Sequence, residues 1–306
     1  MFPCPLFFGL FFGGAEWLIA NPMNYADSFL ATAEASELLM LHSDQNHNYV
    51  LTAATQPSPT ASIDTLAALI AEARMNPANY PDLSDWNIVF FGDSVIGNYT
   101  NITSIPNAVG GITGATVYNM GHGGGHITES GENYSLPDIV SAFIQKDLSL
   151  LPEDNQVSIG MESYFQDAPD GQLCFVINYG LNDYFSGVPI SSEDPYDIYT
   201  FTGAARSSLK RLQEAYPDAH ILINTPNFTT YFQNGTEPHY ESYVMIDYVN
   251  ILKDIASEMN VELLDIYFDS GINANNIYSF STDGCHPNES GRFLISQKIA
   301  LKLADF

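Results

Sequence analysis

Positively charged residues are scarce in this chain. It has 9 Lys and Arg residues against 36 Asp and Glu residues, which gives a formal net charge of -27 at pH 7. A surface with this balance repels the phosphate backbone of nucleic acids and the head groups of an anionic membrane. We therefore expect no nucleic-acid partner. The acidic residues are dispersed rather than gathered in runs, which favours a charged, soluble surface over an acidic binding patch.

Cysteine is also rare. The three cysteines, Cys4, Cys174 and Cys285, form neither a disulfide framework nor a cysteine-rich metal cluster. Cys174 stands near the start of an expected strand, whereas Cys285 stands beside residues that we place at the far end of the sheet, about 20 Å away at the rise of a strand. A bridge between these two cysteines is therefore not expected.

No stretch of the chain is long and apolar enough to span a bilayer. Residues 1–15 form an apolar run that is too short for this and resembles the hydrophobic part of a secretory signal, but no Lys or Arg precedes it. Residues 1–20 are therefore either a signal remnant or a structured apolar arm. We expect no integral membrane segment and a location outside a bacterial cytoplasm, in the medium or at the cell surface, with a cytoplasmic location left open.

A chain of 306 residues, 45% of them hydrophobic, can bury a full core. We expect residues 1–85 to form an N-terminal extension and residues 86–306 to form the main domain. Two helices are predicted in the extension, around Ser28–His42 and Ser62–Asn76. In the second of these, apolar residues recur at helical spacing.

From residue 86 onward, strand and helix patterns alternate. The candidate strands are Asn87–Phe91, Ala115–Asn119, Leu173–Tyr179, His220–Asn224 and Val261–Tyr267. The expected helices are Ile105–Ile112, Leu136–Gln145, Thr202–Tyr216, Tyr240–Met259 and Asn288–Ala304. Several strands read as nearly continuous apolar runs, which is typical of strands covered on both faces. The pattern predicts an α/β domain with a mostly parallel sheet of five strands flanked by helices.

The first of these strands leads directly into Gly92-Asp93-Ser94. A strand that ends in small residues can present a serine side chain clear of the sheet, with free backbone N–H groups beside it. Asp93 is expected to stabilise the turn through its own hydrogen bond to the backbone. Alone, the tripeptide favours an ordinary turn over a nucleophile, because these are common turn residues.

Three further loops follow predicted strands and carry polar or glycine-rich sequences. Asn119–His126 contains three consecutive glycines, so its backbone N–H groups are unobstructed. Gly180–Asp183 places the amide side chain of Asn182 at the same edge of the sheet, where ligands bind in open α/β folds. Asp183 itself is expected to hold its loop. The last loop contains Asp283 three residues before His286, a spacing at which the carboxylate can orient the imidazole.

Together these residues form a complete set for acyl transfer. Ser94 is the candidate nucleophile, His286 the base that removes its proton, and Asp283 the carboxylate that orients the base. The backbone N–H groups of Ser94 and Gly124 and the side-chain amide of Asn182 are the candidate oxyanion donors.

The order and spacing of these four blocks resemble the SGNH hydrolase family, also called GDSL-like esterases and lipases. The positions that match the family's motifs are Ser94, Gly124, Asn182, Asp283 and His286, and the resemblance covers Trp86 to Phe306. It implies a flavodoxin-like three-layer α/β/α sandwich and hydrolysis of esters without a metal or other cofactor. It also implies short acyl groups, often on carbohydrates. Whether Gly124 or its neighbour Gly123 matches the family glycine stays open.

Other side chains in these loops are candidates for substrate binding. His122 and His126 flank the three glycines and could line the acyl or alcohol pocket; a metal site is the alternative, but a third ligand is missing. Tyr184, Tyr231 and Phe232 follow strand ends and could stack on a sugar ring or wall an acyl pocket. Core packing beneath a loop explains these aromatic residues equally well.

The primary hypothesis is thus a serine esterase acting on a small-molecule or glycan ester with a short acyl chain. One alternative is a cell-surface carbohydrate-binding domain that has kept the fold and lost turnover. Another is an O-acyltransferase, which would use the same residues and pass the acyl group to an acceptor other than water. The sequence does not define the oligomeric state.

Overall fold

The computed structural model describes residues 38–43, 49–54, 58–75, 79–152, 155–231 and 243–306. The chain divides into two compact units, Met1–Gln56 and Pro57–Phe306. In the first unit, β1 (Leu38–Ser43) and β2 (Tyr49–Ala54) pair as an antiparallel hairpin.

The helix expected around Ser28–His42 is therefore wrong from Leu38 onward, and its earlier part lies outside the described residues. An apolar run such as Leu38–Leu41 does not by itself distinguish a strand from a buried helix. Here Leu38–Leu41 forms a strand because it pairs with the second apolar run, Tyr49–Ala54.

The larger unit is built on a sheet of five strands, all parallel, as the sequence predicted. In the order in which they lie side by side, the strands are β4 (Thr116–Gly121), β3 (Trp86–Gly92), β5 (Gln172–Asn178), β6 (His220–Asn224) and β7 (Glu262–Leu264). The last is shorter than expected: it ends at Leu264, and α11 (Ile266–Asp269) follows where the strand was predicted to continue.

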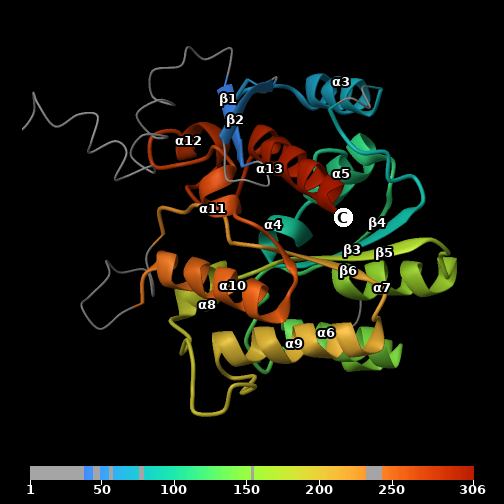
Figure 1. Cartoon of the computed structure of the whole chain (residues 1–306), viewed down its shortest axis with the longest axis vertical. Helices are drawn as coiled ribbons and strands as arrows, with labels where there is room; N and C mark the ends of the chain where they lie inside the picture. Colours follow the sequence, from blue (N-terminus) through green and yellow to red (C-terminus); the bar gives the residue numbers. More distant parts are fainter. Residues whose placement is uncertain (1–37, 44–48, 55–57, 76–78, 153–154, 232–242) are drawn as a thin grey trace, which may run out of the picture. The chain divides into compact units, whose positions relative to one another are not determined.

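Helices cover both faces of this sheet and complete a three-layer sandwich (Figure 1). On one face lie α3 (Ile63–Arg74), α5 (Ile105–Thr113) and α13 (Glu289–Lys302). On the other lie α6 (Leu136–Gln145), α9 (Phe201–Ala215) and α10 (Met245–Met259). Each of these six agrees with a predicted helix to within a few residues, except that α10 begins at Met245 and residues 240–242 lie outside the described part.

The helix starts follow from local sequence. The side chains of Ser62, Thr200 and Asn288 each accept a hydrogen bond from a backbone N–H in the first turn, of α3, α9 and α13 respectively. Such caps satisfy N–H groups that have no partner within the helix. Five further helices in the described residues were not predicted from the sequence: α4 (Ser94–Gly97), α7 (Gln156–Asp167), α8 (Leu181–Ser186), α11 and α12 (Ile277–Phe280). Four of them are only one turn or slightly longer, too short for a periodic pattern.

The register of the sheet aligns the ends of its strands. Gly92 at the end of β3 pairs with Gly121 on β4 and with Asn178 on β5, and Asn178 in turn pairs with Asn224 on β6. The loops that follow these strands therefore emerge at one level, at the carboxyl edge of the sheet. This is the edge at which the sequence predicts the polar loops.

A contact between two glycines fixes the short helix α4 against β4. A Cβ atom added to Gly97 would collide with the backbone carbonyl of Gly121, and one added to Gly121 would collide with the backbone of Gly97. The two backbones therefore approach more closely than any side chain would allow. This approach holds the helix that begins at Ser94 over the end of the sheet.

We expect Gly97→Ala to lower the free energy of unfolding by about 1–3 kcal/mol, because the added methyl group must displace packed backbone. Ser163→Ala on α7, where the side chain is exposed, is the matched control and should change stability by less than about 0.5 kcal/mol. Urea unfolding measures both variants. If the stability of Gly97→Ala equals that of the control, the close approach does not constrain α4.

Candidate active site

Ser94 is the first residue of α4, two positions after β3 ends. The turn between them is held by Asp93, whose Oδ1 accepts a hydrogen bond from the Val95 N–H at 2.9 Å. This confirms the expected turn-stabilising role of Asp93. Ser94 is buried, with 8% of its surface exposed, so only a small part of the residue is open to solvent.

His286 and Asp283 come from the loop that precedes α13. The loop is closed by a bridge between Ser281 and Pro287 and by the Thr282 N–H, which donates to the His286 carbonyl at 3.1 Å. Within it, Asp283 Oδ1 accepts hydrogen bonds from the backbone N–H groups of Cys285 and His286, at 2.9 and 2.8 Å. The loop thus orients its own carboxylate.

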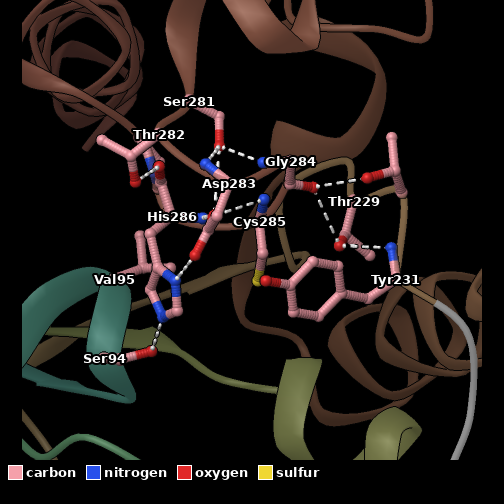
Figure 2. A network of polar contacts seen from close by, with 12 residues as sticks. Ser94, Val95, Thr229, Tyr231, Ser281, Thr282, Asp283, Gly284, Cys285 and His286 are labelled. Carbon is pink, nitrogen blue, oxygen red and sulfur yellow. Dashed lines mark hydrogen bonds and ion pairs between the residues drawn. The ribbon is translucent and has the colours of Figure 1, made fainter. Parts of the chain in front are cut away.

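The structure joins these residues into one chain of hydrogen bonds (Figure 2). His286 Nδ1 lies 2.7 Å from Asp283 Oδ2, and His286 Nε2 lies 3.0 Å from Ser94 Oγ. Burial alone would raise the pKa of Asp283, but the hydrogen bonds from the His286 side chain and from the two backbone N–H groups outweigh it and lower the pKa to about 2. The carboxylate therefore stays ionised at neutral pH and can hold the Nδ1 proton, which leaves Nε2 to accept the serine proton.

The glycine-rich loop after β4 forms a tight turn in which the Gly125 N–H donates to the His122 carbonyl at 3.0 Å. Gly124 has a φ of +82°, in the left-handed region that favours glycine, and a Cβ there would meet open space. Asn182 Nδ2 donates to the Gly125 carbonyl at 2.9 Å, which ties the third loop to this turn. An amide nitrogen carries two hydrogens, so Asn182 keeps a second donor.

Several backbone donors in these loops have no partner. Among the described residues, no acceptor is hydrogen-bonded to the N–H of Ser94, of Gly124 or of its neighbour Gly123. These N–H groups and the second hydrogen of Asn182 Nδ2 are therefore available to an anion at the carboxyl edge of the sheet. The sequence predicts Ser94, Gly124 and Asn182 as the donors, and the choice between Gly124 and Gly123 stays a prediction.

The two histidines of the glycine-rich loop have separate surroundings. His122 stacks on Tyr134, with ring centroids 4.0 Å apart, and His126 Nε2 lies 3.1 Å from Ser186 Oγ. The Nδ1 atoms of both rings are buried without a hydrogen-bond partner among the described residues. Within that described part, no group of three or more His, Cys, Asp or Glu side chains is arranged to hold a metal ion.

The aromatic candidates differ in exposure. Tyr184 is 3% exposed and packs edge-on against Tyr248, so it belongs to the core beneath its loop. Tyr231 is 43% exposed, and its ring lies 5.6 Å from that of Phe185. Phe232 lies outside the described residues. Sequence reasoning missed Tyr278, which is 71% exposed and whose hydroxyl lies 3.3 Å from Thr230 Oγ1, because no motif contains it.

Tyr231 is held beside the loop of Asp283 and His286. The Gly284 carbonyl accepts hydrogen bonds from the Thr230 N–H at 2.9 Å and from the Thr229 hydroxyl at 3.2 Å, and the Tyr231 N–H donates to Thr229 Oγ1 at 3.1 Å. Burial and then the charge of Asp283 raise the pKa of Tyr231. Figure 2 shows the Tyr231 ring beside the loop that carries His286.

Two further carboxyl groups lie buried beneath the site. Asp183 accepts hydrogen bonds from the Ile127 and Thr128 N–H groups, at 2.9 and 3.0 Å, so it ties its own loop to the chain that leaves the glycine-rich turn. Asp93 is fully buried, and its Oδ2 has no hydrogen-bond partner in the described residues. Burial, reinforced by the charge of Asp183, raises the pKa of Asp93 to about 7 despite the hydrogen bond from Val95.

Fold and site thus define a three-layer α/β protein with a serine, a histidine and an aspartate hydrogen-bonded at the carboxyl edge of its sheet. A sequence model of the GDSL-like lipase/acylhydrolase family matches residues 90–292. The chain belongs to this family, which makes it an enzyme of the esterase or lipase type. No curated protein sequence matches the chain significantly.

Solved structures agree on the fold. One is 21% identical over 73% of this chain and 98% of its own, with a TM-score of 0.57. A protein from Lactobacillus plantarum is 21% identical over 72% of this chain and 96% of its own, with a TM-score of 0.55. An acetyl xylan esterase from Geobacillus stearothermophilus is 16% identical over 71% of this chain and 94% of its own, with a TM-score of 0.45.

Two further expectations concern a disulfide bridge and a membrane-spanning segment. Cys174 and Cys285 are both buried and unbridged, as expected. In the described part of the chain, no helix has the length and apolar character needed to cross a membrane.

The raised pKa of Asp93 predicts a pH dependence of stability. Between its ordinary value of 3.8 and about 7, the folded protein binds a proton that the unfolded chain releases, so Asp93 makes the fold less stable as pH rises through this window. Asp93→Asn keeps the acceptor for Val95 and removes the titration. We therefore expect the stability of this variant relative to wild type to increase by about 1–3 kcal/mol between pH 5 and pH 7.5 in urea unfolding.

The control is Asp64→Asn, which replaces an exposed carboxylate in the first turn of α3. Its stability relative to wild type should change little over the same interval. A constant difference between Asp93→Asn and wild type at both pH values would show that Asp93 titrates normally.

Proposed function

We propose that the protein is a serine esterase that hydrolyses short-chain acyl esters, with Ser94, His286 and Asp283 as its catalytic triad. The observation that carries this proposal is the continuous hydrogen-bond chain from Asp283 through His286 to Ser94. Each member meets the geometric requirement of its role, since nucleophile and base, and base and carboxylate, are within hydrogen-bonding distance.

In the first half of the reaction, Ser94 Oγ attacks the carbonyl carbon of the ester while its proton passes to His286 Nε2. The resulting oxyanion is bound by the N–H groups of Ser94 and Gly124 and by Asn182 Nδ2. The intermediate collapses, the bond to the alcohol oxygen breaks, and His286 returns the proton to the departing alcohol. An acyl group remains on Ser94.

In the second half, His286 removes a proton from water, and the resulting hydroxide attacks the acyl-enzyme carbonyl. The same donors bind the second oxyanion, and His286 then protonates Ser94 Oγ as the carboxylic acid leaves. Asp283 stays ionised throughout and stabilises the imidazolium that forms in each half. Transfer of the acyl group to an acceptor other than water would replace water in this half only.

We also propose a neutral, sugar-like alcohol portion for the substrate. The net charge of -27 disfavours anionic esters such as acidic phospholipids. Beside the His286 loop, Phe185, Tyr231 and Tyr278 form an aromatic rim, and Tyr231 and Tyr278 are substantially exposed. Aromatic faces with nearby hydroxyl groups suit a ring that is apolar on one face and polar at its edge.

The preference for a short acyl group follows from the family resemblance. The location outside the cytoplasm stays a prediction of the sequence.

Ser94→Ala should lower kcat for hydrolysis of 4-nitrophenyl acetate by about 10⁴-fold or more, because it removes the nucleophile. Asn182→Ala should lower kcat by about 10²–10³-fold, because it removes one oxyanion donor. Ser163→Ala, an exposed serine on α7, should leave the rate unchanged.

Equal rates for wild type and Ser94→Ala would refute the triad. Glycan binding by wild type without labelling of Ser94 by a fluorophosphonate would favour the binding domain that has lost turnover. If product analysis shows that the acyl group passes to an added alcohol in preference to water, the result would favour the acyltransferase.

For the aromatic rim, we expect Tyr231→Ala to lower kcat/KM for an acetylated monosaccharide about tenfold and to leave kcat/KM for methyl acetate within about twofold. The reason is that only the sugar ester offers a ring to stack on, and tenfold corresponds to about 1.4 kcal/mol of binding. Tyr196→Ala is the matched control, because Tyr196 has the same exposure of 43% and lies beside Lys210 instead. Equal effects of Tyr231→Ala on both esters would show that the aromatic rim does not recognise the sugar ring.

A further inference from the structure

Arg292 is a buried cation in an unfavourable place. It is the fourth residue of α13, is 1% exposed, and is among the largest fully buried side chains of the described residues. The N-terminal end of a helix carries a partial positive charge, so a cation in the first turn is destabilising, and burial of a charge adds a desolvation cost. Such a residue persists only where specific contacts offset these costs.

The contacts of Arg292 use every nitrogen of its guanidinium group. Nε donates to the Thr103 carbonyl at 3.0 Å and Nη2 donates to Thr103 Oγ1 at 2.9 Å. Nη1 donates to the Pro287 carbonyl at 2.9 Å. The group stacks on the Tyr99 ring at 3.8 Å from its centroid, and Glu289 provides an ion pair at 3.5 Å.

These contacts lie on two segments that both lead to the candidate active site. Tyr99 and Thr103 belong to the segment directly after α4, the helix that begins with Ser94. Pro287 directly follows His286. One rigid guanidinium therefore joins the segment of the nucleophile to the segment of the base, which are separated by 192 positions in the chain.

We propose that Arg292 is a positioning residue that sets the approach of His286 Nε2 to Ser94 Oγ. This inference rests on the proposed function. The planar guanidinium presents donors in a fixed fork, so it can hold two acceptors at a defined separation, which the single ammonium group of lysine cannot do. A displacement of about 1 Å between reacting groups can cost about 10²-fold in rate. The same contacts also hold α13 to the domain, so the test must separate alignment from stability.

The experiment compares Arg292→Met, Arg292→Lys and a control on the same helix, Gln297→Met. Gln297 is 5% exposed, and its Nε2 donates to the Tyr80 hydroxyl at 2.8 Å, so the control removes a buried hydrogen bond of α13 that does not reach either active-site segment. Each purified variant is measured for kcat and KM with 4-nitrophenyl acetate, for the rate of Ser94 labelling by a fluorophosphonate, and for thermal unfolding.

In Arg292→Met we expect kcat to fall about 10–100-fold with KM within about twofold, and the labelling rate to fall by a similar factor, because alignment and not substrate binding is lost. Arg292→Lys should lie between Arg292→Met and wild type. Gln297→Met should keep the kcat of wild type even where its loss of thermal stability is similar.

Wild-type kcat in folded Arg292→Met would overturn the inference, and so would an equal loss of kcat in Gln297→Met. If Arg292→Met does not fold, Thr103→Val tests the same bridge by removing the acceptor of Nη2; a severalfold loss of kcat supports the inference, and an unchanged kcat overturns it. Ser94→Ala separates the two proposals. If it is as active as wild type, the proposed function fails; if it is inactive while Arg292→Met is fully active, only the role of Arg292 fails.

Discussion

The aligned ends of the parallel strands are the constraint on which the rest of the structure depends. Because Gly92 pairs with both Gly121 and Asn178, the loops that follow three neighbouring strands emerge at the same level. The backbone hydrogen bonds of the sheet thereby bring together a serine, a glycine-rich turn and an amide side chain that lie far apart in sequence. A shift of one residue in any strand would separate them, since register sets both the level and the direction of each side chain.

The carboxyl groups near the site show how surroundings set charge. Asp283 receives hydrogen bonds from an imidazole and two backbone N–H groups, and its pKa falls to about 2. Asp93 receives one hydrogen bond, lies fully buried beside Asp183, and its pKa rises to about 7. Of these two side chains, only the one next to His286 is firmly ionised at neutral pH. A negative charge on the residue next to Ser94 would oppose the oxyanion that the proposed reaction forms, and burial of Asp93 disfavours such a charge.

The sequence predicted the structure correctly where neighbouring residues in the chain determine it. Ile88–Phe91 could be recognised as a buried strand from its own composition, and the loop containing Asp283 and His286 from its spacing. It did not predict features that depend on contacts with residues distant in sequence. Leu38–Leu41 pairs as a strand because of residues beyond it, and Arg292 resembles any surface cation until its contacts are known. The hydrogen bond from Asn182 to Gly125 likewise depends on two loops meeting, which no local pattern records.

The separation of 192 positions between Ser94 and His286 has a consequence for how the enzyme is made. The ribosome releases the serine strand first, and at about 5–20 residues per second roughly ten seconds or more pass before the histidine emerges. A growing chain can therefore carry Ser94 on a partly formed sheet with no histidine beside it. The hydrogen bond between Ser94 and His286 can form only after both segments have been synthesised and the loop of His286 has docked.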